Sequence, residues 1–281
     1  MTVQAAQHHL MHQLSTIYDS REAANIADWV MENLTGFKKI DRLINKEASL
    51  NPQQLVLLEE YTGELLLHKP IQYVLHEAWF CGMKLYVDEN VLIPRPETEE
   101  LVEWIIADKP SARSILDVGT GSGCIPIALK KKLPKAEVYA CDVSKPALEL
   151  AMKNAREHDT LVNFLQIDFL HKNNWPALPK VDILVSNPPY IPLKDKAAMN
   201  RNVVQYEPHL ALFVQDNDPL IFYAALAGFA LSNLLPGGAI YAEIHEDLGN
   251  SVQELFSAKG FAHTELKKDM QGKNRMIRVS L

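Results

Sequence analysis

The feature that most restricts the fold is a regular alternation of strand-like and helix-like segments from about residue 112 onward. Strands are predicted over 114–119, 137–142, 163–168, 181–187 and 239–244, and helices over 123–132, 146–158, 219–234 and 246–258. This order favours a mostly parallel sheet with helices on both faces. The last two strand-like runs, near 261–268 and 276–281, have only a short connection, so we expect an antiparallel hairpin at one side.

The first 70 residues have a different pattern, which is helical and contains no convincing strand. Apolar residues such as Leu10, Leu14 and Leu43 recur at helical spacing, and Asn51-Pro52 is a typical helix start. We interpret residues 1–70 as a small helical bundle, and we expect its leucine and aromatic side chains, Trp29 included, to form its core.

The segment that follows the bundle predicts a linker. Aromatic and β-branched residues alternate around Cys81-Gly82, which is typical of a β-hairpin. We therefore divide the chain into a helical domain (1–70), a β-hairpin linker (71–95) and an α/β domain (96–281).

Composition excludes several classes of function. The formal net charge is −7, so the chain has no global field for nucleic acid, although a local basic patch stays possible. The three cysteines are scattered and no His/Cys ligand spacing occurs, so we expect reduced thiols, no metal site and a cytoplasmic location. The start of the chain lacks the pattern of a secretory signal, and no apolar run is long enough for a membrane span.

A glycine-rich loop, Asp117 to Gly123 (DVGTGSG), follows the first strand of the α/β domain. Ligands of such sheets bind at the carboxyl ends of strands, near the topological switch point. The spacing is neither GxGxxG nor a P-loop. Asp117 would repel a phosphate but attract an ammonium group.

Acids also end the next two strands. Asp142 can accept bonds from both hydroxyls of a ribose. Asp168-Phe169 offers an acceptor for an adenine amine and an aromatic face for its ring. A ligand with a cation, a ribose and an adenine but no phosphate is S-adenosylmethionine, whose product would be S-adenosylhomocysteine. The alternative is that each acid merely ends a strand, but three successive strand ends argue against it.

The fourth strand ends in Asn187-Pro188-Pro189-Tyr190. An amide or aromatic amine is a poor nucleophile, so a site that methylates it must hold and orient its NH2 group. The Asn187 side-chain oxygen and the Pro188 carbonyl can accept the two hydrogens, and the prolines keep these acceptors fixed. Tyr190 can pack on the planar group of the substrate.

This tetrapeptide behind a DxGxGxG loop resembles the amino-methyltransferases of the class I (Rossmann-like) S-adenosylmethionine fold. Further motifs narrow the resemblance to the peptide-chain release factor glutamine methyltransferase (PrmC/HemK) family; these are residues 92–99 (LIPRPETE), 116–123, 186–191, 206–208 (YEP) and 235–238 (LPGG). The resemblance spans about residue 70 to the end by motif, and the helical domain by architecture.

The resemblance implies a seven-stranded methyltransferase domain that methylates N5 of the glutamine in the Gly-Gly-Gln motif of bacterial class I release factors. It assigns donor contacts to Gly119, Thr120, Gly121, Ser122, Gly123, Asp142 and Asn187, and substrate contacts to Asn187, Pro188, Pro189 and Tyr190. Among the latter, Asn187, Pro188 and Tyr190 carry catalysis. Relatives often have Trp after the third acid; Phe169 keeps an aromatic face without the indole donor.

Three other functions stay open at this point. A ribosomal-protein glutamine methyltransferase shares the tetrapeptide, an adenine-N6 methyltransferase shares the chemistry but needs a basic recognition region, and a scaffold could bind the donor without catalysis. The roles of Arg95, Glu97 and Glu243 are undecided between a pocket and an ordinary helix start or solvated strand end. The expected partner is a release factor, docked by residues 1–70, with no direct nucleic-acid contact and a monomeric enzyme.

Overall fold

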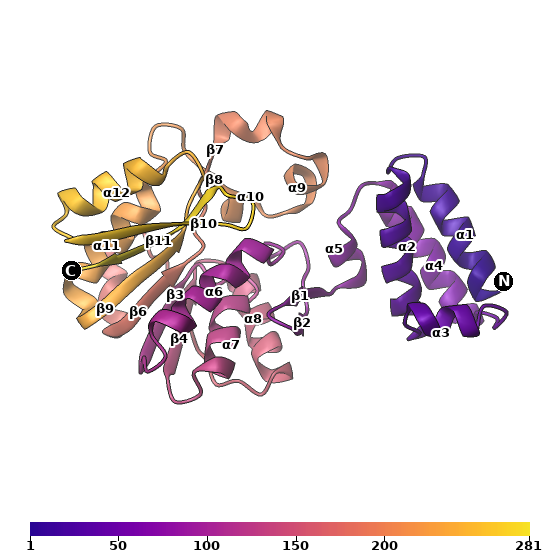
Figure 1. Cartoon of the computed structure of the whole chain (residues 1–281), viewed down its shortest axis with the longest axis horizontal. Helices are drawn as coiled ribbons and strands as arrows, with labels where there is room; N and C mark the ends of the chain where they lie inside the picture. Colours follow the sequence, from indigo (N-terminus) through magenta and orange to yellow (C-terminus); the bar gives the residue numbers. More distant parts are fainter. The chain divides into compact units, whose positions relative to one another are not determined.

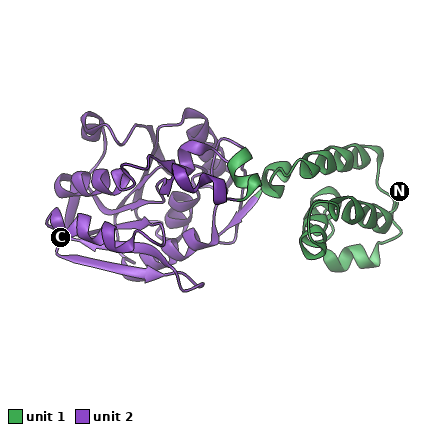
Figure 2. Cartoon of the chain, turned by 90° about the horizontal axis from the view of Figure 1, so that it is seen from above, with its two compact units in different colours: residues 1–77, 200–206 green, residues 78–199, 207–281 purple.

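The computed structural model describes all 281 residues, which form two compact units (Figure 2). The first contains residues 1–77 and 200–206, and the second contains residues 78–199 and 207–281. The division falls at Glu77, inside the segment that we interpreted as a linker, and a short stretch near residue 200 belongs to the N-terminal unit.

The N-terminal unit is entirely helical, as predicted. Its helices are α1 (Val3–Leu14), α2 (Ser20–Thr35), α3 (Lys39–Ile44), α4 (Pro52–Leu66), α5 (Ile71–Leu75) and α9 (Arg201–Tyr206). Helices α1, α2 and α4 pack against one another, and α1 buries Val3, Ala6, Leu10 and Leu14, one residue every three or four positions. Their apolar faces form one core.

The predicted helix start at Asn51-Pro52 is confirmed. The Asn51 side chain accepts from the Gln54 backbone N–H, and the Gln54 side chain accepts from the Asn51 N–H, both at 2.9 Å. This capping box satisfies two of the N–H groups that a helix start leaves unpaired.

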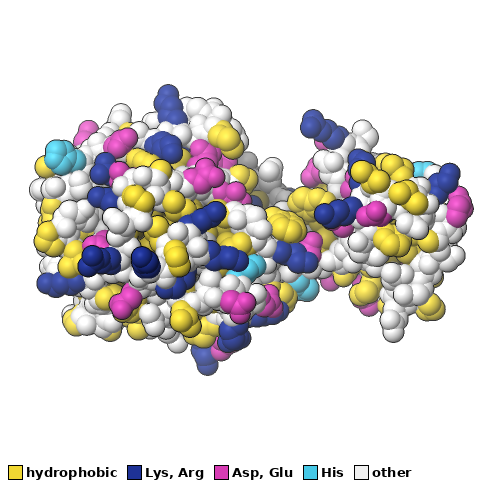
Figure 3. Space-filling view, turned by 60° about the horizontal axis from the view of Figure 1, so that its bottom comes forward, with side chains coloured by type: hydrophobic (Ala, Val, Ile, Leu, Met, Phe, Trp, Pro, Cys, Tyr) yellow, Lys and Arg dark blue, Asp and Glu magenta, His cyan; other side chains and the backbone are white.

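The expectation that the leucine and aromatic side chains of this unit form its core is wrong for Trp29 and Leu43, which are 49% and 69% exposed. Trp29 is not among the side chains on the buried face of α2. For Leu43 the reason lies in α3, a helix of only six residues whose buried side chain is Arg42. Arg42 is held by the Asp28 carboxylate and the Phe37 carbonyl, so the apolar side chains of α3 face outward. Figure 3 shows hydrophobic side chains gathered on the surface of this unit.

The predicted hairpin is present but shorter than expected. It consists of β1 (Ala78–Phe80) and β2 (Met83–Leu85), joined by Cys81 and Gly82 with φ of 49° and 73°. Residues 71–75 form helix α5 instead of a strand. Val74 and Leu75 pack into the helical core, so tertiary burial overrides the β-propensity of this segment.

The second unit contains the predicted seven-stranded sheet, in the order β10-β11-β9-β6-β3-β4-β5 (Figure 1). Its strands are β3 (Ser114–Val118), β4 (Glu137–Asp142), β5 (Asn163–Gln166), β6 (Val181–Ser186), β9 (Leu234–Glu243), β10 (His263–Lys268) and β11 (Asn274–Ser280). The five strands from β9 to β5 are parallel, and β11 pairs antiparallel with both β9 and β10. The antiparallel hairpin at one side is thereby confirmed.

Helices cover both faces of this sheet. Helices α6 (Pro96–Asp108), α7 (Cys124–Lys132) and α8 (Lys145–Glu157) pack with the β1–β2 hairpin on one face. Helices α11 (Ile221–Asn233) and α12 (Gly249–Ala258) pack on the other. Shorter elements connect them: η1 (Lys172–Ala177), β7 (Ile191–Pro192), η2 (Leu193–Ala198), α10 (His209–Leu212) and β8 (Phe213–Val214). None of the helices combines the length and the hydropathy that crossing a bilayer requires.

Candidate functional site

The topological switch point of the sheet lies between β3 and β6. The chain runs outward through β3, β4 and β5 and then returns to place β6 on the other side of β3. Val118 is in register with Ser186, and the Ser186 hydroxyl donates to the Val118 carbonyl at 2.7 Å. The residues that follow, Gly119 and Asn187, therefore begin two adjacent loops at the edge where ligands of such sheets bind.

A cavity of about 300 Å³ lies at this edge. Of the predicted site residues, Gly119, Thr120, Gly121, Ser122, Asp142, Asp168, Phe169, Asn187, Pro188 and Pro189 line it. Gly123 and Tyr190 lie outside its wall. Parts of residues 90–98 and 208–211 also line it, so the segment after the hairpin contributes to the pocket.

The three glycines of the loop all have positive φ, but they do not border the same space. A Cβ added to Gly119 or Gly121 would meet no atom within 4 Å. A Cβ on Gly123, where α7 begins, would lie 3.1 Å from the Ala151 Cβ. The first two glycines thus leave room for a ligand, whereas Gly123 allows α7 and α8 to approach.

Four buried polar atoms around this loop have no hydrogen-bond partner within the protein. They are both carboxylate oxygens of Asp117 and the hydroxyl oxygens of Thr120 and Ser122. Asp117 is fully buried, and burial raises its pKa to about 7. Unpaired buried polar groups are costly, so the loop is suited to a ligand that brings both a positive charge and hydrogen-bonding groups.

Asp142 at the end of β4 is held by the loops on either side of it. Its Oδ2 accepts from the Gly121 N–H and its Oδ1 from the Ser144 N–H, each at 2.9 Å. Burial raises the pKa of this carboxyl. Each oxygen keeps a second lone pair, and because Asp142 lines the cavity, a diol could donate to both oxygens.

Asp168 and Phe169 follow β5 at the same cavity. The Asp168 Oδ1 accepts from the Leu170 N–H at 3.0 Å, which fixes the carboxylate. The Phe169 ring is buried and packs on Trp175 and Phe229, with ring centroids 5.9 and 5.4 Å apart. Phe169 thus joins the pocket wall to the core of the sheet.

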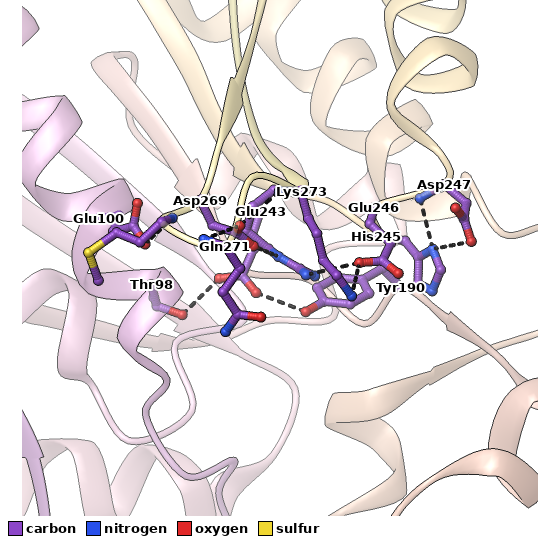
Figure 4. Close-up of polar contacts among 12 residues, drawn as sticks. Thr98, Glu100, Tyr190, Glu243, His245, Glu246, Asp247, Asp269, Gln271 and Lys273 are labelled. Carbon is purple, nitrogen blue, oxygen red and sulfur yellow. Dashed lines mark hydrogen bonds and ion pairs between the residues drawn. The ribbon is translucent and has the colours of Figure 1, made fainter.

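Asn187 is tied to two residues that come from distant elements. Its side-chain nitrogen donates to the Thr98 hydroxyl at 3.1 Å, and this hydroxyl donates to the Glu243 Oε2 at 2.8 Å. The Tyr190 hydroxyl donates to the other oxygen of Glu243, also at 2.8 Å (Figure 4). No protein group donates to the remaining Asn187 acceptor, its side-chain oxygen.

Glu243 and Thr98 were not identified as site residues from the sequence. The sequence left Glu243 as either a pocket residue or a solvated strand end. The second interpretation is wrong, because Glu243 is 1% exposed. Burial raises its pKa, and the hydrogen bonds from Thr98 and Tyr190 oppose the rise. The available signal for Thr98 was its place in the Pro-Arg-Pro-Glu-Thr-Glu stretch.

Arg95, whose role was undecided, forms a pocket wall. Its guanidinium donates to Glu207, and both Arg95 and Pro208 line the cavity. Glu97 does not line the cavity; it lies in the first turn of α6, where an acid is favoured by the helix dipole. No group of three or more His, Cys, Asp or Glu side chains is arranged to hold a metal ion.

Comparison with known proteins agrees with this arrangement. The model of the methyltransferase small domain family matches residues 97–209, and that of the PrmC N-terminal domain family matches residues 5–75. A crystal structure of the hMettl16 catalytic domain in complex with an RNA hairpin superposes with a TM-score of 0.56 at 17% identity, and covers 83% of this chain and 84% of that one. The predicted class I methyltransferase fold is thereby confirmed.

Relatives of similar length are much closer in sequence. The release factor glutamine methyltransferase of Flavobacterium psychrophilum is 43% identical over 272 residues, which are 95% of each chain. That of Bacteroides thetaiotaomicron is 38% identical over 96% of each chain. At this identity over nearly the full length, the chain belongs to the release factor glutamine methyltransferase family, as its motifs predicted.

Proposed function

We propose that the protein transfers a methyl group from S-adenosylmethionine to N5 of the glutamine in the Gly-Gly-Gln motif of class I peptide-chain release factors. The observation that carries this proposal is the register of Val118 with Ser186, which brings the glycine loop and Asn187 to one cavity. The names of the relatives support the release factor as substrate.

The residues of the cavity fit the proposed donor. Thr120 and Ser122 line the cavity, and their hydroxyls, with the fully buried Asp117 carboxylate next to Thr120, suit the ammonium and carboxylate of its methionine part. The two oxygens of Asp142 suit the ribose hydroxyls. Asp168 and Phe169, at the next strand end, suit the adenine amine and ring.

When bound, the donor supplies a methyl group on a positively charged sulfur, ready for attack by a nucleophile. The Asn187 side-chain oxygen accepts one hydrogen of the substrate NH2 group, and the Pro188 carbonyl accepts the other. Two fixed acceptors turn the nitrogen toward the methyl group and stabilise the positive charge that develops on it. As the N–C bond forms and the S–C bond breaks, the nitrogen loses one proton to solvent.

The rest of the tetrapeptide keeps these acceptors in place. Pro188 and Pro189 restrict the backbone, so little ordering is needed on binding. The Tyr190 hydroxyl donates to Glu243, which fixes the side chain. The Tyr190 ring also packs on the His245 ring, with the ring centroids 6.1 Å apart. Because Tyr190 lies outside the cavity wall, its role in this position is to hold the loop that carries Asn187 and Pro188.

We also propose that the N-terminal unit docks the release factor. The exposed apolar side chains of α3, among them Leu43 and Ile44, support this role, since such side chains favour protein contacts. Leu43→Asp should raise KM for the release factor by about tenfold, which corresponds to ~1.4 kcal/mol. Leu161→Asp is the matched control, because Leu161 is also an exposed leucine but belongs to the second unit.

The proposed reaction is tested by incubating the protein with labelled S-adenosylmethionine and, separately, a class I release factor, ribosomal proteins and DNA. Mass spectrometry should find one methyl group on the glutamine of the Gly-Gly-Gln motif. A release factor with Glu in place of that glutamine lacks the amide and should stay unlabelled. Labelling of ribosomal protein or DNA in preference to the release factor would overturn the proposal.

A further inference from the structure

We propose that Thr98 and Glu243 are positioning residues that set which way the Asn187 amide faces. The inference rests on the proposed function, in which the Asn187 side-chain oxygen accepts a hydrogen of the substrate. An asparagine side chain can rotate to exchange its oxygen and nitrogen, so the site needs a device that selects one orientation.

The sheet brings the three residues together. Ser186 is in register with Ala242 on the neighbouring parallel strand, so Asn187 and Glu243 occupy adjacent strand ends. Thr98, in the first turn of α6, lies between their side chains at 3.1 and 2.8 Å. Thr98 is 2% exposed at the wall of the cavity, so little of its surface is open to water.

The chemistry of the three groups gives this chain of bonds one direction. The two carboxylate oxygens of Glu243 are the acceptors from Thr98 and Tyr190, and a hydroxyl has a single proton. When Thr98 donates that proton to Glu243, its oxygen can only accept from Asn187. The Asn187 NH2 group is therefore turned toward Thr98, and its oxygen is left for the substrate.

The same carboxylate also fixes the other end of the tetrapeptide. The second carboxylate oxygen accepts from the Tyr190 hydroxyl, and the backbone carbonyl of Glu243 accepts from the Tyr223 hydroxyl at 3.0 Å. Figure 4 shows Thr98 and Tyr190 reaching Glu243 from opposite sides. One buried acid thus holds Asn187 through Thr98 and holds Tyr190 directly.

Loss of this direction has a defined consequence. If the Asn187 amide rotates, it presents NH2 to the NH2 of the substrate, and two donors face each other without an acceptor. The substrate nitrogen then loses one of the two dipoles that orient it, while the donor site at the glycine loop is unchanged.

The test compares Thr98→Val, which keeps the shape but removes the hydroxyl, with Thr98→Ser, which keeps the hydroxyl. Thr98→Val should lower kcat by about 10- to 100-fold, because the reacting groups are misoriented. Affinity for S-adenosylmethionine, measured by calorimetry, should stay within about threefold, well under ~1.4 kcal/mol. Thr98→Ser should restore most of kcat, which a purely structural role of the side chain would not predict.

Tyr223→Phe is the matched control at Glu243, since it removes a buried hydroxyl bonded to the Glu243 backbone and leaves the carboxylate contacts intact. It should lower the melting temperature without lowering kcat. Glu243→Gln should lower kcat, because an amide offers one acceptor where Thr98 and Tyr190 need two. A kcat of Thr98→Val equal to that of the unchanged protein would overturn the inference.

A second measurement is independent of the substrate. In ¹⁵N NMR spectra, the side-chain NH2 signals of Asn187, identified by their loss in Asn187→Ala, should exchange slowly with water. Thr98→Val should speed this exchange and shift the signals, whereas Thr98→Ser should not. Unchanged exchange in Thr98→Val would overturn the inference, while failure of the unchanged protein to methylate a release factor would overturn only the proposed function.

Discussion

The guanidinium of Arg95 donates to the Glu207 Oε1 at 2.5 Å and joins two segments that lie 112 residues apart in the sequence. The Glu207 side chain is 1% exposed, and its other oxygen accepts from the Ile93 N–H at 3.3 Å. The neighbours of this pair, Pro94 and Pro208, line the cavity. The ion pair therefore holds two segments of the pocket wall together.

Removal of Arg95 should leave a buried carboxylate without its main partner. We expect Arg95→Met to lower the free energy of unfolding by about 1–3 kcal/mol, the usual cost of an unpaired buried group, and to weaken donor binding. Chemical denaturation and calorimetry measure the two effects. Arg156→Met, at an exposed position of α8, is the control; equal losses for the two variants would contradict the role of the pair.

The strands and helices of the second unit could be predicted because their signals are local. The periodicity of each segment depends on a few neighbouring residues, as does the cap at Asn51 in the first unit, which is present. The strand ends that carry the glycine loop, Asp142 and Asn187 follow from the same pattern, because parallel strands place their carboxyl ends at one edge.

The contacts that could not be predicted join distant parts of the chain. Thr98 and Glu243 are 145 residues apart, and their meeting depends on which strand lies beside β6. Likewise, helix α5 forms where β-branched residues suggested a strand, since Val74 and Leu75 are buried by helices that precede them. Tertiary packing, which local propensity does not contain, decided both cases.

Replacement of Asp142 should affect the donor site more than the fold. We expect Asp142→Ala to lower donor affinity by roughly one to two decades, the equivalent of about 1.5–3 kcal/mol for a charge-assisted contact. It should also reduce stability, because the Gly121 and Ser144 N–H groups lose their acceptor. Asp142→Asn keeps one acceptor oxygen, so its donor affinity should lie between those of Asp142→Ala and the unsubstituted protein. Unchanged affinity in Asp142→Ala, measured by calorimetry, would exclude the ribose role.

The buried Asp117 predicts a dependence on pH. Its pKa rises from 3.8 to about 7 on folding, since burial, with a smaller contribution from Asp142, disfavours the charged form. Between these values the folded state binds a proton that the unfolded state has lost. The free energy of unfolding of the ligand-free protein should therefore fall as pH rises from about 4 to about 7, and then level off.

Burial favours the protonated form of Asp117, but a bound ammonium group would favour the ionised carboxylate. Donor affinity should thus increase as pH rises through about 7, by up to about tenfold per unit below the pKa. Asp117→Asn should bind the donor less tightly and without this pH dependence. Calorimetry of both proteins at several pH values makes the comparison, and identical pH profiles would rule out Asp117 as the titrating group.

Substitutions of two glycines in the loop should affect different properties, donor affinity at Gly121 and stability at Gly123. Gly121→Ala would point a methyl group into open space beside the cavity, so we expect donor affinity to fall by about tenfold, or ~1.4 kcal/mol. Gly123→Ala would instead press on Ala151 and should cost about 1–3 kcal/mol of stability through overpacking. Both variants share the strain of positive φ. Thermal melting and calorimetry should therefore rank them in opposite orders.

Substitutions of Asn187 test whether the residue acts by orientation. It cannot act as a base, because an amide side chain has no useful pKa. Asn187→Ala removes one acceptor and should lower kcat by about two to three decades, by analogy with loss of one preorganised hydrogen-bonding group.

Asn187→Asp keeps an acceptor at nearly the same place and adds a negative charge that can stabilise a positively charged nitrogen. It also removes the NH2 group that donates to Thr98, so two carboxylates then compete for one hydroxyl proton. We therefore expect the Asp variant to be slower than the unchanged protein but clearly faster than the Ala variant. Single-turnover rates at saturating donor measure the order, with donor affinity and melting temperature as controls. If both variants transfer the methyl group at the same rate, a hydrogen-bonded acceptor at position 187 does not drive the reaction.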